Sequence, residues 1–470
     1  MEASMRVGGL IAGCAAVLFG FLVAQCGGTG SNFGDGGSNV DAGDTDVTVP
    51  VKDSGNPQFG DGSSEAAPPC QGLQCQVVSC GGGGHTTISG TVYDPAGNNP
   101  LYNILVYVPI FPNDPLPAIT HGMSCDTCAA KITNAMATAL TDAKGHFTIV
   151  DAPVGTNIPI VVQVGKWRRK FTIASTAACV DTPYPNSSTP ANRLRLPAKQ
   201  SEGDMPLIAY ATGCDPMDSL LKKVGIDASE FTSGTGTGMV HVYQGNSTTI
   251  NPSGSTSAYT FWDDVTAMEK HDIVMNACEC SPYHRDKGYA NLDTYLNGGG
   301  RFFGSHYHIN FFTGEQISGS PDAVPADMLN AASWSPTWGS CMTGPYDIDT
   351  SFPKGKAMAD WMQNIFPSAP YAQVAITSGC MVKDILGTVN GISQQWIYDS
   401  ASKAPGYISI NTPTAKLPAD RCGRAVLTDL HVGTTGSTLE QQEAALEFMF
   451  FDLAACVQDD NTVPQPPAPN

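Results

Sequence analysis

Histidines and acids gather where the strands of a predicted sheet end. Residues 278–280 (Cys-Glu-Cys) and 305–308 (Ser-His-Tyr-His) each follow an apolar run, and His431 follows a later one. Imidazole and carboxylate groups bind metals and transfer protons. The residues predicted to form a catalytic group, with room for a divalent metal of unspecified identity, are His306, His308, His431 and Glu279. The alternative is structural, in which these side chains close turns and bond to one another.

Three familiar catalytic or cofactor motifs are missing. Ser305 would need the pattern Gly-x-Ser-x-Gly to act as a hydrolase nucleophile, and residue 307 is Tyr. No Gly-x-Gly-x-x-Gly follows a strand and opens a helix, and no His-Glu-x-x-His occurs. The sequence therefore gives no support for a nucleotide cofactor or for a zinc protease.

The elements that must position these residues alternate along 204–457. Apolar strands are predicted at 206–212, 239–243, 272–277, 301–304 and 424–430, and helices at 215–224, 261–268, 289–296, 356–365 and 439–453. This alternation favours a parallel sheet covered by helices, with ligands bound beyond the carboxyl ends of its strands. Residues 311–420 are interrupted by Pro and Gly, and only one helix is clear there.

The order strand, helix, Gly-Gly-Gly at 298–300, strand and then Gly304-Ser305-His306 resembles class I glutamine amidotransferases, the trehalose-utilisation-type branch above all. The resemblance implies a doubly wound, flavodoxin-like parallel sheet. Amidotransferases carry a nucleophilic cysteine where His306 stands here. Their later histidine is followed by Pro and Glu, whereas Val432 and Gly433 follow His431. Because the nucleophile and the acidic partner are both missing, glutamine hydrolysis is not expected.

Residues 85–180 have strand and turn patterns. Ser-Gly-Thr-Val-Tyr-Asp at 89–94, Thr-Asp-Ala-Lys-Gly-His-Phe at 141–147 and Pro-Val-Gly at 153–155 resemble a carboxypeptidase-regulatory-like domain. That family has a transthyretin-like β-sandwich fold. The resemblance implies an accessory or adhesive module that brings no catalytic residues. The overall fold class is thus multidomain, an all-β sandwich followed by an α/β domain.

The N-terminus resembles a lipoprotein signal. Arg6 precedes an apolar run at 7–24, and Cys26 follows, although Gln25 departs from the small residue usual before the lipidated cysteine. We expect 1–26 to be a signal peptide, with Cys26 lipidated and the chain held on a membrane. A simple cleaved signal and a retained membrane helix are the alternatives. Residues 27–84 are predicted to be a disordered Gly/Ser/Asp-rich linker, 181–203 a second linker and 458–470 a disordered tail.

Export makes disulfides the expected use of the 15 cysteines. The strand at 424–430 and the helix at 439–453 have similar lengths, about 26 Å each way, so Cys422 and Cys456 return to the same end of the sheet. We therefore predict a disulfide between them, with two buried thiols as the alternative. A structural role is predicted for Cys-Asp-Thr-Cys at 125–128.

The formal net charge of −19 argues against nucleic acid as a partner. Segments 165–169 and 422–424 are similar to those of a family of exported bacterial proteins without an established function. Our first hypothesis is an envelope lipoprotein, without a cofactor, whose non-catalytic amidotransferase-like domain binds a carbohydrate or envelope ligand. The alternative is an exported hydrolase that acts on a carbohydrate or related polymer through the His/Glu site. A purely structural envelope protein is the third.

Overall fold

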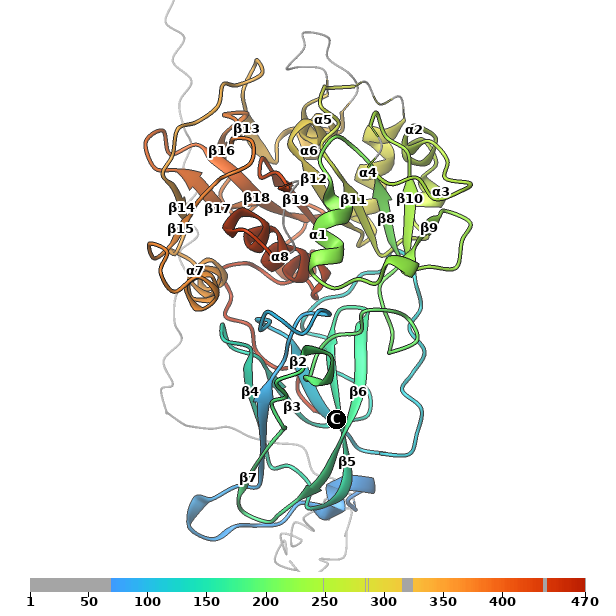
Figure 1. The fold of residues 1–470 in the computed structure, drawn as a ribbon, viewed down its shortest axis with the longest axis vertical. Helices are drawn as coiled ribbons and strands as arrows, with labels where there is room; N and C mark the ends of the chain where they lie inside the picture. The colour runs from blue at the N-terminus through green and yellow to red at the C-terminus, as the bar shows by residue number, and fades with distance from the viewer. Residues whose placement is uncertain are drawn as a thin grey trace, which may run out of the picture. The chain divides into compact units, whose positions relative to one another are not determined.

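The computed structural model describes residues 69–469, apart from 248, 284, 286, 315–323 and 434–437. The predicted signal peptide, the lipidation site Cys26 and most of the first predicted linker lie outside the described residues. Two small β-sheets come first along the described chain, and a ten-stranded sheet with helices follows (Figure 1). None of the described helices combines the length and apolar composition that a membrane span requires.

The two small sheets face each other across one core. Their strand orders are β4-β1-β7 and β3-β2-β5-β6. The bounds are Thr87–Thr91 (β1), Leu105–Pro109 (β2), Ala135–Leu140 (β3), His146–Val150 (β4), Gly155–Val164 (β5), Trp167–Thr176 (β6) and Asp181–Pro183 (β7). Side chains of β4 alternate between buried and exposed, as in a strand with one face on a core. Ile88 and Phe147 of one sheet share a cluster with Val106 and Ile160 of the other, in agreement with the predicted β-sandwich.

Both predicted linkers extend too far into the ordered structure. Residues 69–84 contain the 3-10 turns η1 (Gly72–Gln76) and η2 (Gly81–Gly83), and Leu73 is buried in the core. In the second linker, β7 pairs in parallel with β1. Arg195 is buried there and contacts Glu202 at 2.7 Å. These segments pack because they carry apolar and ion-pairing side chains that a count of Gly, Ser and Pro overlooks.

The large sheet is mixed rather than purely parallel. Its order is β15-β14-β17-β18-β19-β12-β11-β8-β10-β9. The parallel strands are Ile208–Ala211 (β8), Phe231–Ser233 (β9), Val240–Tyr243 (β10), Ile273–Asn276 (β11), Arg301–Ser305 (β12) and Gly423–Thr428 (β19). The antiparallel extension consists of Tyr346–Ile348 (β14), Gln373–Val374 (β15), Ser393–Asp399 (β17) and Pro405–Thr412 (β18). A separate pair joins Ala332–Trp334 (β13) to Ile385–Thr388 (β16).

The antiparallel extension corrects the prediction of a parallel sheet alone. Its strands come from residues 346–412, within the stretch that Pro and Gly interrupt. The connection between β17 and β18 is a short turn, which suits antiparallel neighbours, whereas a parallel pair needs a long crossover.

Helices cover both faces of the large sheet. Val240, Met275 and Val426 belong to one core cluster, and Ala209 and Val274 belong to the other, because alternate residues of a strand face opposite sides. On the first face lie Met217–Lys223 (α1), Pro353–Ile365 (α7) and Gln441–Ala454 (α8). On the second lie Ala258–Trp262 (α2), Val265–Met268 (α3), Gly288–Asn297 (α4), Asn310–Thr313 (α5) and Ala326–Leu329 (α6). The remaining 3-10 turns are Pro190–Asn192 (η3), Ala228–Glu230 (η4), His306–Ile309 (η5) and Pro418–Asp420 (η6).

Segment 165–169 lies against the α/β part. Gly165 has a φ of +51°, and a Cβ there would lie 1.9 Å from the carbonyl oxygen of Ala454. Lys166 donates to Asp272 at 2.6 Å, and Trp167 packs edge-on against Phe450 of α8 with ring centroids 5.4 Å apart. These contacts give the segment a packing role, since only glycine permits this approach of the two backbones.

The predicted disulfide between Cys422 and Cys456 is wrong. Cys422 bonds to Cys125, and Cys456 bonds to Cys128. The two cysteines do come to one end of the sheet, but the Cys-x-x-Cys loop at 125–128 supplies a partner for each. The other described disulfides are Cys70–Cys75, Cys80–Cys179, Cys214–Cys280 and Cys341–Cys380. Among the described cysteines, Cys278 is the free thiol.

The C-terminal segment contacts the fold as far as Pro467, so the predicted disordered tail is also wrong. Asp460 is buried and contacts Arg424 at 3.0 Å and Lys354 at 3.3 Å. Thr138 of β3 donates a hydrogen bond of 2.7 Å to the carbonyl oxygen of Pro467. Ion pairs hold this segment although its many prolines exclude helix and central strand.

Candidate functional site

Polar side chains meet where four parallel strands end. Asp215 follows β8, Cys278 follows β11, His306 follows β12, and Asp429 and His431 follow β19. Because these strands are parallel, their carboxyl ends lie at one edge of the sheet, which is where ligands bind in open α/β sheets. His306 and His431 lie at this edge, as the sequence predicted.

His306 has an unusual backbone conformation at the first residue of η5. Its φ is +43°, a region that costs a non-glycine residue about 1–3 kcal/mol and that is frequent at functional sites. Its ring stacks on Tyr307 with centroids 4.0 Å apart, and the Sγ of Cys278 lies 3.4 Å from its Nδ1. Burial, with a smaller effect from His431, lowers the pKa of His306 to about 3, so the ring is neutral at neutral pH.

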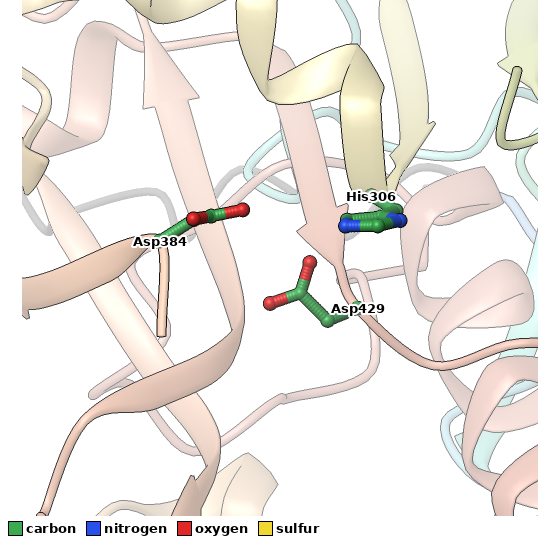
Figure 2. Close-up of side chains that lie close together, drawn as sticks. All are labelled: His306, Asp384 and Asp429. Atoms are coloured by element: carbon green, nitrogen blue, oxygen red, sulfur yellow. The ribbon is translucent and has the colours of Figure 1, made fainter. Parts of the chain in front are cut away.

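Two buried aspartates face this ring. His306, Asp384 and Asp429 each offer an atom within 4.8 Å of the others, and one ring nitrogen points toward the carboxylates (Figure 2). Asp384 directly precedes β16 and accepts a 2.6 Å hydrogen bond from the backbone N–H of Gly339. Burial raises the pKa of Asp384, and burial together with the charge of Asp384 raises the pKa of Asp429 well above its usual range. This trio can hold a cation or a shared proton.

A His–Asp pair lies beside the trio. The rings of His306 and His431 have centroids 5.4 Å apart in an edge-on arrangement. The Nδ1 of His431 is 3.5 Å from Oδ2 of Asp215, whose Oδ1 accepts a 2.8 Å bond from the N–H of Val432. The side chain of His431 is 20% exposed while that of Asp215 is 2% exposed, so an acid inside the fold orients an accessible imidazole. A Cβ on Gly379 would lie 2.5 Å from the His431 ring, so glycine there leaves space for it.

Glu279 and His308 belong to a separate buried cluster. Both side chains are 0% exposed, and Oε2 of Glu279 lies 4.0 Å from Nε2 of His308. Glu279 forms an ion pair with Arg285 and accepts a 2.9 Å hydrogen bond from the Tyr259 hydroxyl. The Nε2 of His308 lies 2.8 Å from the carbonyl oxygen of Ala277. The four predicted residues therefore form two pairs. His306 and His431 are accessible, whereas Glu279 and His308 are inaccessible and join strand ends to helices.

Cys278 is close to the histidines but poorly suited to attack a substrate. Burial raises the pKa of its thiol to about 12, so near neutral pH it is protonated, and the thiolate is the nucleophilic form.

The sequence did not predict Asp384 and Asp429, the two acids of the trio. Asp429 was read as part of the strand at 424–430, and Asp384 comes from the Pro- and Gly-interrupted stretch.

Comparisons with known proteins do not identify a relative that explains this site. No family model matches the chain, and no curated protein matches it. Two crystal structures of interface mutants of a type II cohesin–X-dockerin complex from Acetivibrio cellulolyticus are 16% and 15% identical. They cover 32% of this chain and 78% and 75% of their own, with a TM-score of 0.16 each. A 9R-lipoxygenase from Cyanothece PCC8801 is 11% identical over 79% of this chain and 48% of its own, with a TM-score of 0.11. These scores are too low to support an argument about fold or function.

Proposed function

We propose that the α/β part of this chain is a hydrolase in which His431, oriented by Asp215, is the general base. The proposed substrate is an ester or amide carried by a carbohydrate or related envelope polymer. The observation that supports this proposal best is the close approach of His431 to both His306 and Asp215 at the carboxyl edge of the sheet.

The chemistry requires a water molecule and one movable proton. Nε2 of His431 takes a proton from the water, and the hydroxide adds to the substrate carbonyl. When the tetrahedral intermediate collapses, the protonated ring returns the proton to the leaving alcohol or amine. Asp215 orients the ring from the side of Nδ1, and its 3.5 Å separation is the long geometry common before substrate binds. Oδ2 of Asp215 has no hydrogen-bond donor among the described atoms, so it is free to serve Nδ1.

The substrate class is inferred from aromatic side chains at the site. Tyr307 stacks on His306, and Trp338 meets Tyr307 edge-on with centroids 4.9 Å apart. Both rings are half-buried, so each keeps an accessible apolar surface. Such surfaces pack against the apolar faces of sugar rings, which supports a carbohydrate substrate.

The family resemblances remain part of the proposal. Five of the six parallel strands, β10-β8-β11-β12-β19, follow the second-first-third-fourth-fifth order of flavodoxin-like sheets, and the short β9 adds a strand beyond β10. This order supports an amidotransferase-like, trehalose-utilisation-type domain. His306 on its strand-to-helix turn takes the place of the amidotransferase cysteine, so glutamine hydrolysis is not proposed. The preceding β-sandwich is proposed to be a carboxypeptidase-regulatory-like accessory module.

The proposed location is the cell envelope, with lipid anchoring at Cys26. The six disulfides of the described chain support export, because such bonds persist in oxidising compartments. The net charge of −19 supports a partner other than nucleic acid.

A second candidate is an envelope protein that binds a carbohydrate without cleaving it. The paired rings of Tyr307 and Trp338 favour it, since they offer a binding surface that needs no catalysis. In this case the His–Asp pair would contact ligand hydroxyl groups.

Hydrolysis assays separate the two candidates. The purified protein is tested on p-nitrophenyl acetate and on acetylated oligosaccharides, together with His431→Ala, Asp215→Asn and the exposed sandwich control His146→Ala. We expect His431→Ala to lower kcat/KM by about 10²–10⁴-fold, the usual contribution of a general base, and His146→Ala to leave it unchanged. Saccharide binding without turnover would support the second candidate, and full activity in His431→Ala would contradict the first.

A further inference from the structure

We infer that His306, Asp384 and Asp429 form a binding site for one divalent transition-metal ion, with Zn²⁺ the best match. The inference concerns the ion itself and does not depend on the hydrolysis proposed above. The three residues come from the ends of β12 and β19 and from the start of β16, so distant parts of the chain converge on one point (Figure 2).

The geometry is close to that of a metal centre. The three donor atoms lie within 4.8 Å of one another. Zinc bonds to nitrogen and carboxylate oxygen are about 2.0–2.2 Å long, which places tetrahedral ligands roughly 3.5 Å apart. A rotation of the two carboxylates that moves their oxygen atoms by about 1 Å would bring the three donor atoms to these distances around one ion. Three protein ligands leave a fourth position open, as in catalytic rather than structural zinc sites.

Two orphaned oxygen atoms point independently to a cation. Oδ2 of Asp384 and Oδ2 of Asp429 are buried and lack a hydrogen-bond partner among the described atoms. Asp384 is 0% exposed and Asp429 is 4% exposed. Within the described residues, no Lys or Arg forms an ion pair with either carboxylate. A buried carboxylate without a counter-charge is costly, and a bound cation supplies that charge.

The position of His306 between β11 and β19 explains which nitrogen is available. β12 lies between these two strands in the sheet. Nδ1 lies near Cys278 at the end of β11, which leaves Nε2 for the side of β19, where Asp429 lies. A second-shell contact at one ring nitrogen is the usual way in which a protein orients a metal-binding imidazole. The N–H of Gly339 similarly holds Oδ1 of Asp384 and leaves Oδ2 toward the site.

The ligand set selects a class of ion. One imidazole and two carboxylates suit Zn²⁺, Mn²⁺ or Fe²⁺, whereas Mg²⁺ and Ca²⁺ prefer oxygen ligands alone. The rival interpretation is a carboxyl pair that shares a proton, which would hold no metal. Direct titration with the metal distinguishes the two.

The test is isothermal titration calorimetry of the chelator-treated full chain with ZnCl₂, and with MgCl₂ for comparison. We expect one equivalent of Zn²⁺ with a dissociation constant of micromolar or below, a higher Tm with zinc, and weak or undetectable Mg²⁺ binding. Asp429→Asn and His306→Ala should each weaken zinc binding at least tenfold. His85→Ala is the matched control, because His85 and Asp151 form an exposed His–Asp pair 2.7 Å apart that could bind zinc adventitiously.

Several outcomes would overturn the inference. They are a folded wild-type protein that binds less than half an equivalent of zinc, binding that survives Asp429→Asn, and binding that disappears in His85→Ala. If Asp429→Asn fails to fold, the zinc X-ray absorption spectrum of the wild-type protein decides, since sulfur ligation or all-oxygen ligation would contradict this site. Zinc binding without ester hydrolysis would support this inference and contradict the proposed function, whereas hydrolysis by a protein that binds no zinc would do the reverse.

Discussion

Buried aspartates lie beside both ends of β19, in opposite electrostatic settings. At its start, Arg424 contacts Asp452 at 2.7 Å and Asp460 at 3.0 Å. Lys354 of α7 adds a second positive charge, 2.8 Å from Asp452. Burial alone would favour the neutral acid, yet the charges of Arg424 and Lys354 lower the pKa of Asp460. Two cations and two anions thus balance in this cluster, which ties the sheet, two helices and the C-terminal segment together.

At the carboxyl end, Asp429 and Asp384 have no such partner among the described cations, and burial raises the pKa of both. A protein that needed only stability would gain from replacing these acids with apolar residues. Both pairs of aspartates are buried, so burial does not distinguish their roles, but the charges around them do. Balanced buried charge holds the fold together, whereas the buried acids without a counter-charge form the site that we propose binds a metal ion.

Removing Arg424 should have the largest effect on stability. In Arg424→Met, Asp452 and Asp460 keep their burial but lose one of their two cations, and breaking a buried ion pair in this way costs about 3–5 kcal/mol. Urea unfolding monitored by circular dichroism measures the loss. Lys356→Met removes an exposed partner of Asp360 on α7 and should leave the midpoint unchanged. A midpoint shift no larger than that of Lys356→Met would mean that the balanced cluster contributes nothing, and the comparison would fail.

The sequence predicted the elements around both clusters better than the clusters themselves. The strand at 424–430 and the helix at 439–453 correspond to β19 and α8, because long apolar runs have a clear period. His306 and His431 were placed together because parallel strands end at one edge. The partners of Arg424 were not predicted, since Asp460 lies in a proline-rich segment that has no periodic pattern.

The site residues and the disulfide that the sequence predicted wrongly or not at all have related physical causes. Asp384 comes from a stretch of short antiparallel strands, where neither helical nor strand period survives. Glu279 was grouped with the histidines because it follows a strand, but Arg285 and Tyr259 hold it inside the fold. The pairing of Cys125 with Cys422 spans 297 residues, a contact that no local pattern encodes.

A third buried pair of acids tests what happens when a proton is the only counter-charge. Asp94 of the β-sandwich and Glu447 of α8 are both 0% exposed, and Asn99 donates to Glu447 at 2.7 Å. Burial raises the pKa of Asp94 to about 7 and, together with the charge of Asp94, raises that of Glu447 well above its usual value. A raised carboxyl pKa gives stability that is complete below about pH 4 and is lost as the pH rises through 7.

Asp94→Asn should therefore stabilise the protein at pH 8 by on the order of 2 kcal/mol, with little change at pH 4.5. Urea unfolding of the variant and of the wild-type protein at both pH values gives the difference. Asp114→Asn, at an exposed loop position, is the control and should follow the wild-type curve at both pH values. A difference between Asp94→Asn and the wild-type protein that does not change with pH would show that this pair is not protonated in the folded state.

The smallest effect on stability, and a large one on activity, is expected from Gly379→Ala at the unbalanced end. Gly379 has a φ of +68°, and a Cβ there would lie 2.5 Å from Cδ2 of His431. The strained backbone should cost about 1 kcal/mol, well below the loss expected for Arg424→Met. The ring must move away from the added methyl group, and a displacement of about 1 Å at a catalytic group lowers turnover by roughly 10- to 100-fold. Gly387→Ala is the matched control, because a Cβ there meets no atom within 4 Å and its φ is ordinary. Measuring kcat/KM and Tm for both variants sharpens the comparison between the two ends of β19. A change at Arg424 should mainly lower stability, whereas a displacement of His431 should mainly lower activity. If Gly379→Ala lost stability but kept wild-type turnover, His431 would not be the general base, and the site would have to work through the metal trio alone.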